Sequence, residues 1–504
     1  MRYPIAMEID EKRTEPRLVR QGLLPCVLKP ARRPMDLTAQ AGLVLVAETI
    51  MALGVEELVE VELRLRRRQR GYSEADKLIA LVLLLAAGGD CVEDVRVLQG
   101  DPALGRLLER SIPSADALSA FLVQFHDDVG MKGRPKSGAW IAPENKALAA
   151  LGRIQQELVR RAVCKQNPSQ ATLDLDATIL ESHKREALAH YKGGRGYQPT
   201  AVLWAEQDLA VADQYRDGNV PAGMDTLQVA QRAFAGLPDS VTQRYFRGDS
   251  ACYDERLLKW LWRERIAYSI SADMTPQLRT KCCDWAVKWE PLEDRVNETV
   301  AVTELEYETG NWPKEAPPMR YVGLRLSGKQ GRLFSDGTDT KYLAVVSNRR
   351  ELSSGDLVRW HWEKAGTIEH LHDVTKNDLG ARMPPSGRFG VNAAWYRLNL
   401  LTYNVLTVLK REALPQRLRL ARPKRLRFEV FHVAACLQQH ARRLTAELGA
   451  PEVTVKLERS IIASGAKKTG QLPARRSCET CCLLTGARRP EVRLSPTDQC
   501  RLLR

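Results

Sequence analysis

The stretch LDLDAT, residues 173–178, decides the fold, because it places two aspartates inside a hydrophobic run that has the composition of a β-strand. Successive residues of a strand point to opposite faces, so Asp174 and Asp176 share one face. Two like charges side by side repel each other and are costly to bury. We therefore expect this face to hold a group that offsets the negative charge.

Strands and helices alternate in the residues that follow this stretch. Apolar periodicity and turn residues predict, in chain order, strands at 171–180, 199–207 and 209–217, a helix at 224–237, a strand at 241–251, a helix at 253–266 and a strand at 267–272. Helical patterns precede this region and resume at about residue 355, where they are predicted to continue through 428–449. Three β-like runs between them are too long to be a loop and predict an inserted subdomain.

The fold class that we expect is therefore α/β and multidomain, with a mixed-sheet core, a β-strand insertion and a helical N-terminal domain. The predicted segments are an irregular arm at 1–35, a helical DNA-binding domain at 36–165, the first part of a catalytic core at 166–274, the insertion at 275–352, the last core and C-terminal helices at 353–455, and a basic flexible tail at 456–504. Within 36–165, Ser73 and Asp76 have the spacing of a helix N-terminal capping box.

The balance of charge favours a polyanionic partner. The chain has 76 Lys and Arg against 62 Asp and Glu, which gives a net charge of +14 and a pI near 9.3. Nucleic acid is the first expectation for such a protein. The longest apolar run, at 78–89, is too short to span a bilayer and the N-terminus is charged, so we expect a cytoplasmic protein without a membrane partner.

Two basic segments are candidates for contacts with DNA phosphates. The alternative for both is solvated surface, which for residues 64–70 would be a helix end. The candidate residues are Arg64, Arg66, Arg67, Arg68, Arg70, Arg417, Arg419, Arg422, Lys424, Arg425 and Arg427. Residues 111–128 predict a turn and a helix, either as half of a helix-turn-helix or as a core helix.

Cysteines cluster near the C-terminus, at Cys478, Cys481, Cys482 and Cys500. The CETCC spacing resembles a zinc site but lacks a matching second pair, so free thiols in a tail are the favoured interpretation.

Three acidic residues are candidates for metal-binding catalysis. Asp176, with Asp174 beside it, lies on the first predicted strand, Asp249 at the end of the fourth, and Glu369 on a later helix. Mg²⁺ prefers oxygen ligands, and two such ions can activate an attacking oxygen and neutralise a leaving one on a phosphodiester. Lys376 follows Glu369 by two helical turns on the same face, where it is either a phosphate contact or part of a solvated surface.

Three blocks of sequence resemble bacterial insertion-sequence transposases of the DDE type, and most closely the thirteen-eighty branch of the insertion-sequence-four superfamily. The blocks lie at 173–199, 245–261 and 366–406, and the resemblance covers about residues 36–450. It implies a ribonuclease H-like core with a β-strand insertion. It also implies two Mg²⁺ ions, for which Mn²⁺ can substitute, and cleavage of transposon ends followed by strand transfer.

The resemblance also assigns residues. It implies that Asp176, Asp249 and Glu369 are catalytic metal ligands, with Asp174 as a further ligand or a partner. The family's last-helix signature is Tyr, two residues, Arg, three residues, Glu, six residues, Lys. Glu369 and Lys376 match it, whereas Trp362 stands at the Tyr position and Ala365 at the Arg position. Trp362 can stack on DNA, and Lys364 or Arg359 can compensate for the missing arginine.

The function predicted from these residues is DNA transposition. We expect a nucleoid-associated enzyme that binds double-stranded DNA at the inverted-repeat ends of its element and acts as a homodimer on DNA. Two alternatives stay open: a transposase relic that only binds DNA, and a metal-dependent nuclease without strand transfer.

Overall fold

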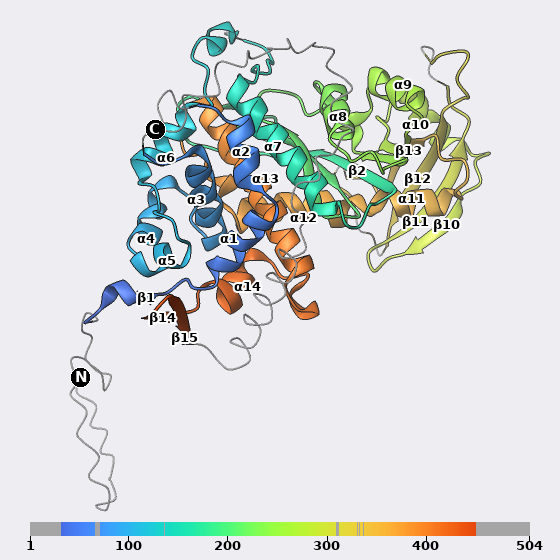
Figure 1. Ribbon diagram of the computed structural model, residues 1–504. Helices are drawn as coiled ribbons and strands as arrows, with labels where there is room; N and C mark the ends of the chain where they lie inside the picture. The colour runs from blue at the N-terminus through green and yellow to red at the C-terminus, as the bar shows by residue number, and fades with distance from the viewer. Residues whose placement is uncertain are drawn as a thin grey trace, which may run out of the picture.

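The computed structural model describes residues 32–449, apart from 66–70, 136, 309–311, 330, 332 and 336 (Figure 1). The predicted arm up to residue 31, the arginines at 66–70 and the tail with its cysteines lie outside the described residues. Among the described residues, no helix is long and apolar enough to cross a membrane.

A nine-stranded mixed sheet forms the centre of the fold. Its order is β7-β6-β2-β8-β9-β13-β12-β11-β10, and β2, β8 and β9 are parallel to one another. The strands are β2 (Gln170–Ala177), β6 (Thr200–Trp204), β7 (Leu209–Gln214), β8 (Gln243–Gly248), β9 (Ala267–Ser271), β10 (Glu290–Asp294), β11 (Glu298–Leu305), β12 (Arg320–Gly328) and β13 (Thr340–Ser347). The strands of the predicted insertion continue this sheet, because β13 pairs antiparallel with β9.

Helices precede the sheet, connect several of its strands and follow its insertion. The first group is α1 (Leu43–Ala52), α2 (Val55–Glu62), α3 (Glu74–Ala87), α4 (Val95–Gln99), α5 (Pro102–Leu107), α6 (Ala115–Val123) and α7 (Lys146–Val163). The others are α8 (Thr226–Ala235), α9 (Glu255–Arg263), α10 (Pro276–Cys283), α11 (Ser354–Trp362), α12 (Lys364–Asn377), α13 (Phe389–Glu412) and α14 (Pro423–Leu426). The predicted capping box begins α3: the Ser73 side chain accepts from the Asp76 backbone N–H, and Asp76 accepts from that of Ser73.

Helix α13 joins the two halves of the structure. Every residue from Phe389 to Lys410 is buried, and a helix that is buried on all sides needs neighbours on all sides. It packs against α1, α3 and α7 and against strand β7, so that it runs between the N-terminal helices and the sheet (Figure 1).

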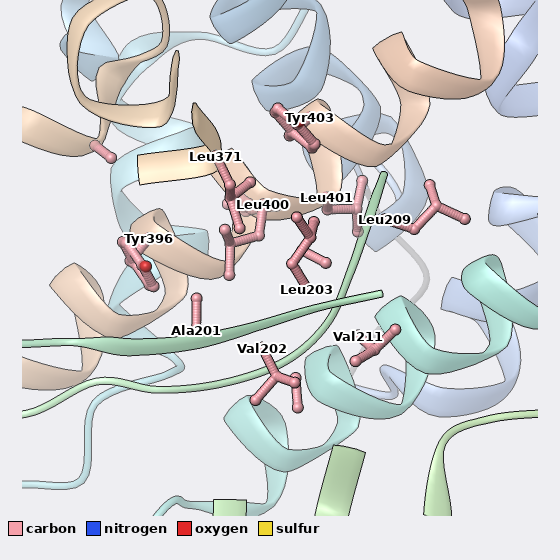
Figure 2. Close-up of a cluster of buried hydrophobic side chains, with 14 of the residues drawn as sticks. Ala201, Val202, Leu203, Leu209, Val211, Leu371, Tyr396, Leu400, Leu401 and Tyr403 are labelled. Atoms are coloured by element: carbon pink, nitrogen blue, oxygen red, sulfur yellow. The ribbon is translucent and has the colours of Figure 1, made fainter. Parts of the chain in front are cut away.

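The core beside α13 follows the alternation of β6, the strand next to edge strand β7. Figure 2 shows Ala201 and Leu203 of β6 on the side of Tyr396 and Leu400 of α13, while Val202 points to the opposite side of the sheet. A β-bulge shifts the pairing of β6 with β7 between Val202 and Leu203. Such a bulge leaves one residue without a direct partner and increases the local twist.

The C-terminal part of the predicted helical region is different in the structure. Residues 428–449 were expected to be helical, but they form a short π-helical turn and then the hairpin of β14 (Ala435–His440) and β15 (Arg443–Leu448). The hairpin pairs with β1 (Leu37–Thr38) in a separate sheet. The cause is a long-range pairing: Ala435 and Leu437 are buried in alternation, and strand β1 comes from the other end of the chain.

A buried ion pair fixes α13 to the sheet. Arg397 donates through Nε to Asp213 Oδ1 at 2.7 Å and through Nη2 to Asp213 Oδ2 at 3.1 Å and Glu144 Oε1 at 2.8 Å. Burial alone would raise the pKa of Glu144, but Arg397 and Arg232 lower it to about 2. Both acids therefore depend on Arg397 for compensation.

We predict that Arg397→Met lowers the free energy of unfolding by about 3–5 kcal/mol, because it leaves Asp213 buried without its partner. The matched control is Arg153→Met, which breaks a more exposed pair with Glu62 at 2.7 Å and should change stability by less than about 0.5 kcal/mol. Urea denaturation followed by circular dichroism measures both. Equal effects of the two substitutions would contradict the assigned role of Arg397.

Candidate active site

Two aspartates meet where parallel strands β2 and β8 end. The register pairs Asp174 with Arg247 and Leu175 with Gly248, so its continuation places Asp176 opposite Asp249. Asp176 is the penultimate residue of β2, and Asp249 directly follows β8. Because both strands run in the same direction, the two carboxylates lie at the same edge of the sheet.

The two carboxylates affect each other electrostatically. Burial raises the pKa of Asp249, the negative charge of Asp176 raises it further, and Lys364 opposes both effects. Lys364 Nζ lies 3.5 Å from Asp176 Oδ1, and only 9% of Lys364 is exposed. A lysine ammonium is therefore held against an acidic pair that would otherwise be unfavourable.

A neutral histidine lies on the other side of Asp176. His372 Nε2 is 3.7 Å from Asp176 Oδ2. Burial, and after it the charges of Lys376 and Lys364, lower the pKa of His372 to about 3. Neither ring nitrogen of this buried histidine has a hydrogen-bond partner among the described residues. The imidazole is thus uncharged at neutral pH.

Helix α12 presents the third predicted acid at the rim of the site. Glu369 is exposed and lies three residues before His372, so the two are neighbours on the helix surface. Lys376, on the next turns, donates from Nζ to Thr178 Oγ1 at 3.1 Å. In the described part of the chain, the carboxylates of Asp176, Asp249 and Glu369 do not all lie within 4.8 Å of one another.

The donor set fits a hard divalent cation. Asp176 and Asp249 supply carboxylate oxygens from adjacent strands, which is the ligand type that Mg²⁺ prefers. Their mutual repulsion is the kind that a bound cation relieves, and Glu369 stands on the neighbouring helix with an exposed carboxylate. Asp176, Asp249 and Glu369 are therefore the residues that could hold the metal.

Asp174 lies below this pair and is fully buried. Its Oδ1 accepts from Arg247 Nε at 2.6 Å and its Oδ2 from Arg247 Nη2 at 2.9 Å, and Thr367 Oγ1 also donates to Oδ2. Both oxygens are thus engaged by the protein. Sequence reasoning missed Arg247. It precedes Asp249 by two residues, as Asp174 precedes Asp176, but this spacing becomes informative only once the parallel register of β2 and β8 is known.

Trp362 and Arg64 are two other residues that are predicted to contact DNA. The ring of Trp362 is covered by the Arg295 guanidinium, 4.5 Å from the ring centroid, and packs against the cluster between α11 and the insertion strands. Arg64 is exposed just after α2. A contact of either residue with DNA stays a prediction.

Two cations of the second basic run are bonded inside the protein, and the other four are exposed. Arg422 donates to both oxygens of buried Asp378, at 2.9 and 3.0 Å, and Arg427 donates to the backbone carbonyls of Leu85 and Ala86 at the end of α3. Arg417 and Arg425 both pair with Glu429. Lys424 lies 3.5 Å from Asp378. Arg419, the last cation of the run, is exposed.

Comparison with known proteins identifies one family. The sequence pattern of the family described as "Transposase DDE domain group 1" matches residues 32–464. One similar solved structure is a cryo-EM structure of the piggyBac transposase synaptic complex with hairpin DNA. It has 13% sequence identity, a TM-score of 0.42, and coverage of 89% of this chain and 85% of that chain. A search of curated proteins finds no match. The predicted bacterial insertion-sequence branch is finer than this family description and stays a prediction.

We predict that Arg422→Gln acts on stability, because it removes a bidentate partner from buried Asp378. The expected loss in the free energy of unfolding is about 1.5–3 kcal/mol. Arg419→Gln, the matched control three residues earlier, should leave stability unchanged. If Arg419 contacts a phosphate, Arg419→Gln reduces the slope of the logarithm of the DNA-binding constant against the logarithm of the salt concentration by about 0.9. Equal stability of the two variants in urea denaturation would contradict the structural role of Arg422.

Proposed function

We propose that this chain, which belongs to the transposase DDE domain group 1 family, cuts and joins DNA at the carboxylates of Asp176, Asp249 and Glu369. The observation that carries the proposal is the placement of Asp176 opposite Asp249 at one edge of the sheet. We further propose that the DNA consists of the inverted-repeat ends of the element that encodes the protein. Because two ends must be joined, the active form on DNA would be a homodimer.

The arrangement of the sheet supports a ribonuclease H-like assignment of the core. A small separate sheet is formed by β3 (Leu180–Glu181), β4 (Leu188–Ala189) and β5 (Arg195–Tyr197). When these short strands are left out, β2 and β8 are the first and fourth strands after α7. They are neighbours and parallel, and Asp176 and Asp249 lie at their ends. This is the placement that the sequence resemblance implies for the first two acids.

A divalent metal, typically Mg²⁺, is implied by the family. Bound by these carboxylates, a pair of such ions would activate the attacking oxygen and neutralise the leaving one, with Mn²⁺ as a substitute. The protein's own part is to hold the ligands. Asp176 and Asp249 come from a rigid sheet, whereas Glu369 comes from α12 at the rim, where DNA would enter.

Lys364 is the residue that we propose for the phosphate contact that Ala365 cannot make. Ala365 is exposed, whereas the Lys364 ammonium lies 3.5 Å from Asp176 Oδ1. Arg359, the other candidate, is directed to Asp356 at 3.2 Å on the exposed side of α11. A scissile phosphate bound at the two aspartates would therefore be within reach of Lys364, with Lys376 further along the helix.

We predict that Asp176→Asn, Asp249→Asn and Glu369→Gln each lower cleavage by about a hundredfold or more, since residues around metal ligands alone contribute about 10–100-fold. End binding should persist, because phosphate contacts made elsewhere hold the DNA. The measurement is Mg²⁺-dependent cleavage of labelled duplex carrying the inverted repeats that flank the reading frame, with binding followed by gel shift.

The control for this series is Asp356→Asn, an acid of α11 that pairs with Arg359 away from the site; it should cleave as the wild type does. Binding without cleavage by the wild type itself would favour the DNA-binding relic. Cleavage without joining would favour the nuclease.

We predict that Lys364→Met lowers the single-turnover cleavage rate by about one to two decades, because a charge-assisted contact to phosphate is worth roughly 1.5–3 kcal/mol. Adding Ala365→Arg to this variant should restore part of the rate, since it supplies the arginine of the family signature. An unchanged rate in Lys364→Met would show that another cation holds the phosphate.

A further inference from the structure

We propose that Arg247 is a positioning residue, which sets the spacing of Asp176 and Asp249 by clamping the two strands just below them. The inference rests on the proposed function, because it concerns the same metal-binding carboxylates. It also gives Asp174 a role other than metal ligand: Asp174 is the other half of the clamp.

The clamp lies one step below the acidic pair. Asp174 and Arg247 are register partners on β2 and β8, and each stands two residues before one of the two acids, so all four side chains share one face of the sheet. The guanidinium meets the carboxylate through two bonds, at 2.6 and 2.9 Å. A bidentate pair fixes both the distance and the orientation of its partners.

The same guanidinium also reaches helix α12. Arg247 Nη1 donates to the Trp360 carbonyl at 2.7 Å and to Glu363 Oε2 at 2.8 Å, where α11 gives way to α12. Thr367, one turn into α12, donates to Asp174. The Arg247–Asp174 pair is therefore bonded to all three elements that carry the candidate ligands: β2, β8 and α12.

The charge of Arg247 matters as much as its shape. Asp174 and Arg247 have side-chain exposures of 0% and 2%. Without the arginine, a buried carboxylate would lie directly beneath two others, and the strand ends would be pushed apart. Lysine keeps the charge but cannot form the planar bidentate contact. Arg247→Lys thus changes the geometry of the clamp while retaining its positive charge.

The first experiment measures Mn²⁺ binding to the full-length protein by electron paramagnetic resonance, without DNA. The binding site of interest is the one whose bound Mn²⁺ is present in the wild type and absent in Asp176→Asn. We expect Arg247→Lys to weaken its affinity by about tenfold. The matched control is Arg397→Lys, which alters a similarly buried bidentate pair with Asp213 on edge strand β7, two strands away from β2. It should lower thermal stability but leave this affinity unchanged.

The second readout compares cleavage in Mg²⁺ and Mn²⁺. Mg²⁺ demands near-ideal octahedral geometry, so Arg247→Lys should lose about tenfold or more in Mg²⁺ and less in Mn²⁺. Arg397→Lys should lose the same factor in both. Equal losses in both metals for Arg247→Lys would overturn the proposal.

Each remaining outcome is also decisive. Absence of an Asp176-dependent Mn²⁺ site in the wild type would overturn the proposed metal site and, with it, this inference. A site that depends on Asp176 but not on Arg247 would overturn the inference alone. If Arg247→Lys does not fold, Thr367→Val removes the tie from α12 to Asp174, together with the hydroxyl's local bonds to the Glu363 and Lys364 carbonyls. A smaller loss of affinity in the same direction then supports the proposal, and no loss overturns it.

Discussion

The structure depends on the enclosure of α13. Its 22 residues from Phe389 to Lys410 are buried, and several of them are polar, so the surroundings must supply both apolar contacts and specific partners. The N-terminal helices cover one side and strand β7 the other. Asn404 bonds both backbone groups of Ala210 near the β7 bulge, and Arg397 bonds Asp213. The sheet that carries the candidate site is thus held in place by a helix that contributes no residue to the acidic pair.

The parts of the site that follow from local pattern were predictable. Alternation identified the strand of Asp176, and Asp249 was placed at the end of the fourth predicted strand. Helical spacing placed Glu369 and Lys376 on one helix, as α12 confirms. The pairing of Asp174 with Arg247 was not predicted, because it is a contact between residues 73 apart in sequence. Only the register of two strands brings these residues together, and no local periodicity encodes it.

Two features of the fold could not be predicted from local sequence pattern, for the same reason. The insertion strands were expected to form a subdomain of their own, yet β13 joins β9 and lengthens the central sheet. Residues 435–448 were expected to be helical, yet they form a hairpin on β1, which lies near residue 37. In both cases the local sequence allows more than one structure, and a distant strand edge decides between them.

The enclosure of α13 also has a consequence for synthesis on the ribosome. The N-terminal helices end with α7 at Val163, but the helix that they surround begins only at Phe389. At about 5–20 residues per second, translation of the intervening segment takes roughly 10–45 s. Throughout that interval the apolar faces of α1, α3 and α7 lack their central partner. The nascent chain therefore exposes an unfinished core for nearly half of its translation, so we expect elongation rate and chaperone capture to affect the yield.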